Sequence, residues 1–233
     1  MRALPPAQLA RPVVVFNGYH GWWGLASTVR DALRAATGSN DIVCVSYAHR
    51  CSLAAAASDA RRAIERHLGK AYATGDASFD AVGISMGGII ARMLATPGVD
   101  ASDERTLSHA RAGEKLNIAR VFTLGTPHRG AMRAEHLPVD AAAQAMRASS
   151  PTTCALQRSV EAGLGPTLRC FAQTRDGVVG TRNCSPRGVR CERMPGPRFG
   201  SHFSSARNPV FLAAIVRELR DEAGTHEAKG SNN

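Results

Sequence analysis

The sequence has no long hydrophobic run, few aromatic residues and few acidic ones. No apolar run reaches the roughly 18 residues that a membrane-spanning helix needs, so we expect no transmembrane segment. Aromatic side chains make up 5% of the 233 residues. Acidic residues number 19 against 29 lysines and arginines, which gives a formal net charge of +10. This imbalance suggests an anionic partner, although net charge governs solubility and electrostatic steering rather than fold.

The sequence also shows neither a secretory signal nor a metal-binding pattern. Residues 1–16 carry two adjacent prolines where a signal peptide has its apolar stretch, and no small-residue cleavage site follows. The default expectation is a cytoplasmic protein, or a secreted one if the chain is a mature or trimmed form. The six cysteines include no CxxC pair and no His/Cys spacing typical of a metal site. They are either scattered buried thiols or include a disulfide, for which Cys184 and Cys191 are close enough in sequence.

Short β-rich runs alternate with helical patterns along the chain. The candidate strands are Val13–Phe16, Ile42–Tyr47, Phe79–Ile84, Arg120–Gly125, Leu168–Gln173 and Gly188–Met194. The candidate helices are 25–37, 53–68, Met86–Ala95 and Pro209–Ala223. Because such alternation forms βαβ units, we predict an α/β fold with about six mostly parallel strands and helices on both faces. We expect one domain over residues 1–223 and a flexible tail over 224–233.

One segment, residues 129–166, interrupts this alternation. It contains no convincing strand, and a helix-prone stretch is followed by Ser, Pro and Gly residues that favour turns. The segment lies between the fourth and fifth candidate strands. It is therefore either a cap or lid over the edge of the sheet where ligands bind, or only a long connection with one crossover helix.

The stretch Gly83-Ile84-Ser85-Met86-Gly87 matches the pattern G-x-S-x-G. The pattern alone is weak evidence, because a tight turn between a strand and a helix also favours small residues. Its context is more informative, since an apolar strand precedes it and a helical pattern follows it. A nucleophile elbow requires that arrangement, in which a sharp turn exposes the serine hydroxyl at the sheet edge. We therefore predict that Ser85 is a nucleophile.

Two further candidate strands end in glycine-containing loops, in the stretches VVVFNGYHGWWG (13–24) and VFTLGTPHRG (121–130). Together with the serine motif, they resemble the α/β-hydrolase fold lipases and esterases, in particular small bacterial triacylglycerol lipases. The resemblance spans residues 12–216, and the GTPHRG segment is its most specific part. It implies an α/β-hydrolase fold of compact size. The sequence departs from the family at Asn17, where a histidine usually precedes the glycine.

The same resemblance implies an oxyanion hole made of two backbone N–H groups. Met86, directly after the serine, would supply one of them. The other comes from Tyr19 if Asn17-Gly18 replaces the usual His-Gly pair, which we prefer, or from Trp22 if His20-Gly21 does. Trp22 and Trp23 are candidates for the lining of an acyl pocket, although adjacent tryptophans are as often simple packing residues.

A serine hydroxyl needs a histidine base that is oriented by a carboxylate. In this fold the chain order is serine, acid, histidine. His202 precedes the last helix and is the expected base. Asp176 directly follows the fifth strand and is the expected acid, whereas Asp140 in the 129–166 segment is read as a solvated charge. His128 precedes every plausible acid, so we expect it to support the GTPH loop or to form part of the substrate pocket.

These residues predict a serine hydrolase that cleaves carboxylic esters through an acyl-enzyme on Ser85, without metal or cofactor. An acyltransferase or thioesterase would use the same triad, and a non-catalytic binding module of the same fold remains a third reading. The arginines of residues 169–198 either form a basic solvated face, which is the simpler interpretation, or surround the mouth of the site and attract an anionic lipid surface as a partner. Basic residues are spread over the chain without a nucleic-acid-binding motif, so we expect no nucleic-acid partner.

Overall fold

The computed structural model describes residues 9–47, 50–99, 115–136 and 140–230, with the backbone alone at residues 22–23 and 221–230. Its centre is a six-stranded sheet in the order β2-β1-β3-β4-β5-β6, and every neighbouring pair is parallel. The strands are β1 Val13–Phe16, β2 Ile42–Val45, β3 Phe79–Ile84, β4 Ile118–Leu124, β5 Thr167–Gln173 and β6 Cys191–Met194. The expected number of strands and the parallel arrangement are confirmed.

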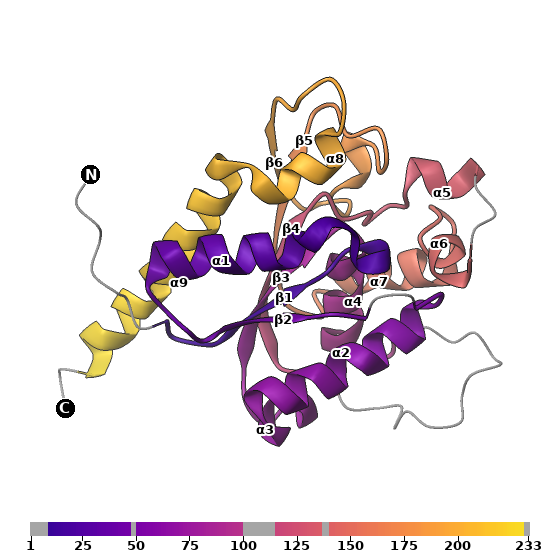
Figure 1. The fold of residues 1–233 in the computed structure, drawn as a ribbon. Coiled ribbons are helices and arrows are strands. Elements are labelled where there is room, and N and C mark those ends of the chain that lie inside the picture. The colour runs from indigo at the N-terminus through magenta and orange to yellow at the C-terminus, as the bar shows by residue number, and fades with distance from the viewer. Residues whose placement is uncertain (1–8, 48–49, 100–114, 137–139, 231–233) are drawn as a thin grey trace.

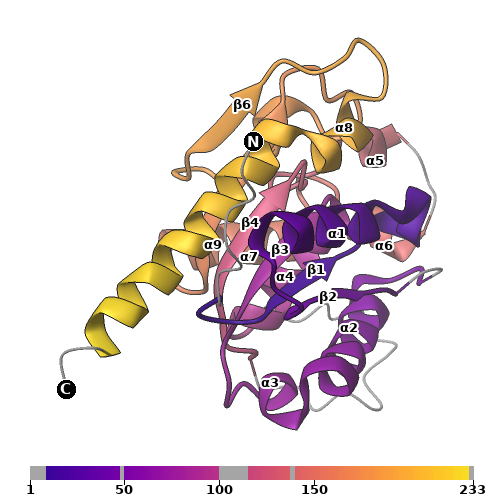
Figure 2. The ribbon, with the colours of Figure 1, turned by 60° about the vertical axis from the view of Figure 1, so that its left-hand side comes forward.

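Helices cover both faces of the sheet (Figure 1). On one face, α1 (Leu25–Thr37) and α9 (Pro209–Gly230) pack with inward side chains such as Val13 and Val15. On the other face, α2 (Leu53–Leu68) and α4 (Met86–Ala95) pack with Val14 and Phe16. Successive residues of β1 thus point to opposite faces, and both faces are apolar because both are buried. Figure 2 shows the same two layers after a rotation.

Several predicted boundaries differ from the structure by a few residues. The second strand ends at Val45 rather than Tyr47, and β4 begins at Ile118, where it pairs with the start of β3. The sixth strand begins at Cys191 instead of Gly188. Its parallel pairing with β5 begins where Cys191 lies opposite Cys170, and Gly188 lies in the turn before it. The last helix extends to Gly230, past the predicted end at Ala223. None of these shifts moves a strand out of the sheet.

The 129–166 segment contains three short helices, namely α5 (Met132–His136), α6 (Ala141–Ala145) and α7 (Pro151–Glu161). Residues 137–139 lie outside the described residues. The N–H groups of Met132 and Arg133 donate to Val179 and Val178, which follow β5. The Ala142 N–H donates to the Cys51 carbonyl oxygen, in the connection that leaves β2. The segment therefore contacts loops beyond the carboxyl ends of two strands.

No described helix combines the length and the apolar character that crossing a membrane requires. The remaining helices are short: α3 (Lys70–Thr74), α8 (Ser201–Ser204), and the 3₁₀ helices η1 (Tyr19–Gly24), η2 (Thr181–Asn183) and η3 (Ser205–Arg207). Two of them matter for the site. The turn η1 follows β1, and α8 lies directly before η3 and α9.

Candidate active site

Ser85 occupies the sharp turn between β3 and α4. Its backbone has φ 51° and ψ −121°, a conformation that non-glycine residues rarely adopt. Its N–H donates to the Leu124 carbonyl oxygen at 2.9 Å, and its own carbonyl oxygen accepts from the Gly88 N–H at 3.1 Å. Strain of this kind persists only where the surroundings fix the backbone, and here a strand and a helix do so on either side.

The two glycines of the G-x-S-x-G stretch are required by close backbone approach. A Cβ at Gly83 would lie 2.4 Å from the Gly88 Cα, and a Cβ at Gly87 would lie 2.4 Å from the Phe16 carbonyl oxygen. Both obstacles are backbone atoms, which cannot rotate away as a side chain can. The pattern therefore lets α4 begin against β3 and β1 with no room for a side chain at either position.

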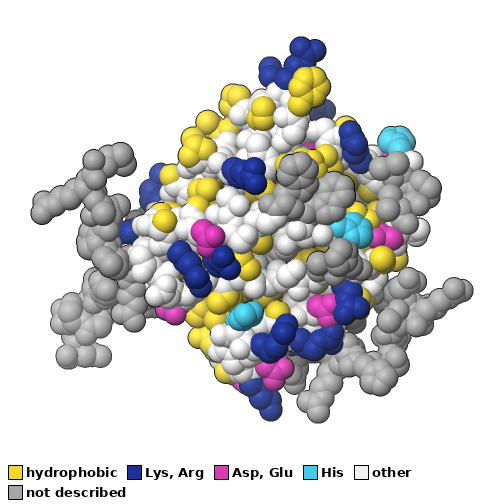
Figure 3. Space-filling view, viewed as in Figure 1, with side chains coloured by type: hydrophobic (Ala, Val, Ile, Leu, Met, Phe, Trp, Pro, Cys, Tyr) yellow, Lys and Arg dark blue, Asp and Glu magenta, His cyan; other side chains and the backbone are white. Residues whose placement is uncertain are grey.

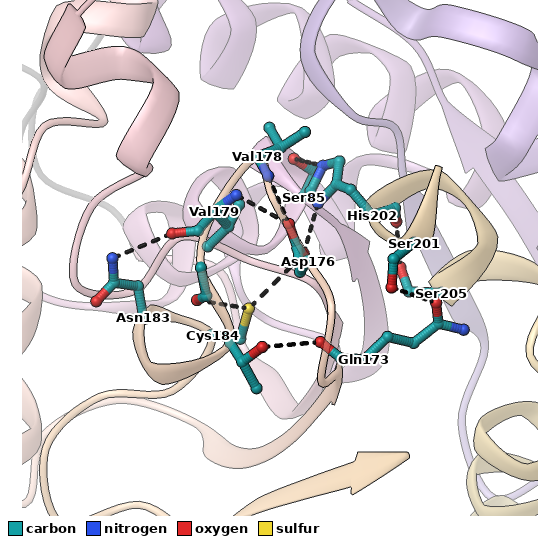
Figure 4. A network of polar contacts seen from close by, with 12 residues as sticks. Ser85, Gln173, Asp176, Val178, Val179, Asn183, Cys184, Ser201, His202 and Ser205 are labelled. Carbon is teal, nitrogen blue, oxygen red and sulfur yellow. Dashed lines mark hydrogen bonds and ion pairs between the residues drawn. The ribbon is translucent and has the colours of Figure 1, made fainter. Parts of the chain in front are cut away.

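His202 links Ser85 to Asp176 (Figure 4). The His202 Nε2 atom lies 3.0 Å from Ser85 Oγ, and its Nδ1 atom lies 2.8 Å from Asp176 Oδ2. An ionised carboxylate can only accept, so Nδ1 carries the proton and Nε2 is left to accept from the serine hydroxyl. The three side chains predicted from the sequence as nucleophile, base and acid are thus brought into one continuous hydrogen-bonded chain.

Asp176 is held in its ionised form by its neighbours. Burial alone would raise the pKa of its carboxyl group, but the hydrogen bond and charge of His202 and the backbone N–H groups of Val179 and Val178 outweigh burial and lower that pKa below its ordinary value. Those N–H groups lie 2.9 and 3.0 Å from Asp176 Oδ1. One carboxylate oxygen thus serves the loop and the other serves His202.

A second set of polar contacts, which the sequence did not indicate, fixes the turn that carries His202. Gln173, the last residue of β5, accepts through Oε1 from the hydroxyls of Ser201 and Ser204, at 2.9 and 2.7 Å. The Ser205 hydroxyl donates to the His202 carbonyl oxygen at 2.7 Å. The short helix α8 is thereby attached to the strand that also leads into Asp176, so acid and base share one support.

The segment 17–19 lies beside the candidate nucleophile. A Cβ at Gly18 would lie 3.7 Å from the Ser85 Cβ, and the Gly18 N–H donates to Asn17 Oδ1 at 2.9 Å. The N–H groups of Tyr19 and Met86 begin η1 and α4, and neither has an acceptor among the described residues. These are the two donors predicted for an oxyanion.

The GTPH segment (residues 125–128) lies directly against the candidate acid and base. A Cβ at Gly125 would lie 3.3 Å from both Asp176 Oδ2 and His202 Nδ1. His128 is buried with 1% exposure, and its Nδ1 lies 2.9 Å from an Nη atom of Arg92. Burial and then the Arg92 charge lower the pKa of His128 well below its ordinary value. His128 thus supports the loop and has almost no surface to offer a substrate.

The tryptophan side chains of residues 22–23 fall outside the described residues, so the predicted acyl-pocket lining is not located there. All six cysteines lie in the described part of the chain and none of them forms a disulfide there, Cys184 and Cys191 included. Cys184 is buried with its Sγ 4.0 Å from Asp176 Oδ2. Within the described ranges, no group of three or more His, Cys, Asp or Glu side chains is arranged to hold a metal ion.

Solved structures identify the fold. No protein-family model matches the sequence, and no curated protein matches it. The mature form of the Bacillus licheniformis lipase BlEst2 superposes with a TM-score of 0.59 at 15% identity, over 94% of this chain and 96% of that chain. The phospholipase PlaB from Legionella pneumophila gives 0.59 at 12%, over 91% and 61%. The metagenomic carboxyl esterase MGS0156 gives 0.56 at 13%, over 95% and 79%. The chain has the α/β-hydrolase fold, as predicted.

Proposed function

We propose that the protein is a serine hydrolase that cleaves carboxylic esters through an acyl-enzyme on Ser85. The observation that carries the proposal is the chain of contacts from Ser85 Oγ through His202 to Asp176, at 3.0 and 2.8 Å. Esterases and lipases among the structural neighbours support an ester substrate. A carboxylate, an imidazole and a hydroxyl in this order are what an acyl transfer needs.

In the first step, Ser85 Oγ attacks the ester carbonyl carbon while His202 Nε2 takes the hydroxyl proton. The electron pair of the carbonyl moves onto its oxygen, which the N–H groups of Met86 and Tyr19 then stabilise. Collapse of this intermediate breaks the bond to the alcohol, which leaves with the proton from His202. Asp176 stays ionised throughout and stabilises the imidazolium through its hydrogen bond with Nδ1.

In the second step, water replaces the alcohol. His202 takes a proton from the water, whose oxygen attacks the acyl carbon, and the same two N–H groups hold the second oxyanion. The carboxylic acid is released and Ser85 Oγ regains its proton. An acyltransferase would differ only in the acceptor, and a thioesterase only in the leaving group. A binding module without catalysis is less favoured, because the three side chains form complete contacts.

The test is labelling with a phosphonate probe that reacts with activated serines, followed by a panel of p-nitrophenyl esters of increasing chain length. We expect labelling of the wild type and none of Ser85→Ala. His202→Ala should lower kcat by several orders of magnitude and Asp176→Asn by about 10⁴-fold. Retained hydrolysis in Ser85→Ala would refute the proposal, and a larger loss in Asp140→Asn than in Asp176→Asn would reassign the acid.

Two additions separate the alternatives. Added alcohol acceptors that divert the acyl group from water would identify an acyltransferase, and preference for thioesters would identify a thioesterase. If residues 129–166 form a lid over an apolar pocket, the rate should rise when a long-chain ester passes its solubility limit. A much higher rate on soluble short-chain esters, with no rise at the interface, would make the protein an esterase.

An anionic lipid surface is the partner that the charge favours. Exposed arginines lie over residues 169–198, and Phe199, with 83% of its surface exposed, follows them beside the Arg198 guanidinium. Figure 3 shows hydrophobic and basic side chains together where the loop between β6 and α8 projects. We propose that this loop meets anionic headgroups with Phe199 inserted. Salt should weaken binding to anionic vesicles and leave turnover of a neutral soluble ester unchanged; equal salt effects would refute this partner.

A further inference from the structure

Two of the three tyrosines hold the segment that lies beside Ser85. The Tyr47 hydroxyl donates to the Asn17 carbonyl oxygen, and the Tyr19 hydroxyl donates to Asp140 Oδ2 at 2.7 Å. The third, Tyr72, lies on α3 with its ring 6.4 Å from that of Phe79. Both ends of the 17–19 segment are therefore anchored by a phenol, to partners that come from other parts of the chain.

The pKa of the Tyr19 hydroxyl indicates which group carries the proton in its hydrogen bond with Asp140. Burial, then the hydrogen bond and the negative charge of Asp140, raise the pKa of the Tyr19 phenol far above its ordinary value. The Tyr19 hydroxyl is therefore the donor in this contact, and Asp140 is the acceptor. The contact joins residues 121 positions apart in the sequence.

Asp140 is itself fixed, so it can act as an anchor. Its second oxygen, Oδ1, accepts from the Ala143 N–H at 2.8 Å and thereby caps α6. The preceding N–H in this helix, that of Ala142, donates to the Cys51 carbonyl oxygen at 2.7 Å. The Asp140 side chain has 12% of its surface exposed. The carboxylate thus connects a positioned helix with the loop beside Ser85.

The loop needs such an anchor because its backbone is strained. His20 has φ 56°, and apart from Ser85 it is the one described non-glycine residue with a positive φ. Its ring lies 4.0 Å from that of Tyr19, edge to face, and its Nε2 lies 3.7 Å from Asp140 Oδ2. His20, the strained residue, thus directly follows Tyr19, whose N–H is a proposed oxyanion donor. The side chain of Tyr19 itself holds this part of the loop through its hydrogen bond with Asp140.

We propose that the Tyr19 hydroxyl and Asp140 are positioning groups, which hold the Tyr19 N–H in place for the oxyanion. The catalytic part of this inference rests on the proposed ester hydrolysis. Neither group touches the reacting atoms. Their role is to keep a backbone donor oriented, and a donor that points elsewhere costs transition-state stabilisation without weakening substrate binding.

The matched experiment compares Tyr19→Phe with Tyr72→Phe. Each variant loses one phenolic oxygen and keeps its ring, but only Tyr19 is linked to the loop. On a soluble p-nitrophenyl ester we expect Tyr19→Phe to lower kcat about tenfold with KM unchanged, and Tyr72→Phe to keep wild-type values. A trifluoromethyl ketone, which forms a charged hemiketal on Ser85, should bind Tyr19→Phe more weakly by the same factor as kcat falls.

A second variant tests the partner. Asp140→Ser keeps a side-chain oxygen that can cap α6 but removes the acceptor for Tyr19. If the two groups act through one contact, the double variant should lose no more kcat than the more affected single variant. If instead the two single-variant losses of kcat multiply in the double variant, Tyr19 and Asp140 have independent roles, and the inference that they act through one contact is overturned.

Peptide-resolved hydrogen exchange separates this inference from the proposed function, because it needs no activity. We expect faster exchange over residues 17–21 in Tyr19→Phe and an unchanged rate in Tyr72→Phe. If the wild type hydrolyses no ester and takes no probe, the proposed function fails while the exchange result still decides whether Tyr19 holds the loop. Unchanged exchange, or a kcat of Tyr19→Phe within twofold of Tyr72→Phe, would overturn the inference.

Discussion

The two proposed oxyanion donors are placed by different means. Met86 begins α4 at an elbow whose flanking glycines leave no space, with backbone atoms 2.4 Å from each hypothetical Cβ. Tyr19 begins η1 in a loop that is held by tyrosine hydroxyl groups. The elbow is thus fixed by excluded volume together with its own backbone hydrogen bonds, whereas the loop depends on hydrogen bonds from side chains.

The difference has consequences for what each region tolerates. Steric fixation by backbone atoms gives way only if a whole element moves, because close-packed interiors transmit strain. Hydrogen-bond fixation can be removed one contact at a time, and each contact contributes about 1 kcal/mol to stability. We therefore expect substitutions at the elbow to affect fold and activity together, and substitutions at the loop to separate them.

The largest effect is expected for Gly83→Ala. The new Cβ would lie 2.4 Å from the Gly88 Cα and 2.5 Å from the Gly88 nitrogen, so α4 must shift away from β3. We expect the free energy of unfolding to fall by about 3 kcal/mol and ester hydrolysis to fall by orders of magnitude. Denaturant unfolding and steady-state kinetics measure both.

Gly177→Ala is the matched control, since no atom lies within 4 Å of its hypothetical Cβ although it directly follows Asp176. It should retain stability and activity. If Gly83→Ala were as stable and active as this control, steric fixation of the elbow would be the wrong description.

A smaller effect is expected for Tyr47→Phe. This variant removes the donor to the Asn17 carbonyl oxygen and leaves that buried oxygen without its partner. The free energy of unfolding should fall by about 1–3 kcal/mol, measured by denaturant titration. Turnover should fall less than in Gly83→Ala, because Tyr19 still holds the other end of the loop.

Tyr72→Phe again provides the comparison, with the same atom removed at a distance from the loop. A loss of turnover in Tyr47→Phe as large as in Gly83→Ala would mean that the loop is as rigidly determined as the elbow, and the contrast between the two regions would disappear.

The smallest expected effect is on the stability of the protein at acid pH. It concerns Asp176, which belongs to neither the elbow nor the 17–19 loop. Its pKa is lower in the folded state than its ordinary value of 3.8, so its contribution to stability is complete above about pH 4. It is lost as the pH falls through the lowered pKa. Asp176→Asn should remove that part of the acid dependence, at most one proton or about 1.4 kcal/mol per pH unit. Thermal melts between pH 2 and 5 would show it, and identical slopes would contradict it.

The sequence predicts those features that depend on residues close together in the chain. Gly83, Ser85 and Gly87 are close together in the chain, so the elbow can be read directly, and the alternation of strands and helices predicts the sheet. The chain positions of Asp176 and His202, each just after a strand or before a helix, led to the residues that the structure brings to Ser85.

The remaining features depend on distant contacts, and no local pattern indicates them. Asp140 reads as a solvated charge because its partner Tyr19 is 121 positions away. Gln173 and Tyr47 look like ordinary residues at strand ends, and only the assembled fold shows what their side chains bind. Strand boundaries shift for the same reason, since a strand begins where its neighbour offers a partner.

The separation of Ser85 from His202 by 117 positions has a consequence for how the protein is made. During synthesis from the N-terminus, the strand and helix that flank the serine leave the ribosome well before the histidine does. An all-parallel sheet consists of long-range pairings, which form slowly compared with local ones. The contact between His202 and Ser85 therefore forms only after β5 and β6 have joined the sheet and α8 has packed beside them, and the reactivity proposed for Ser85 depends on that late step.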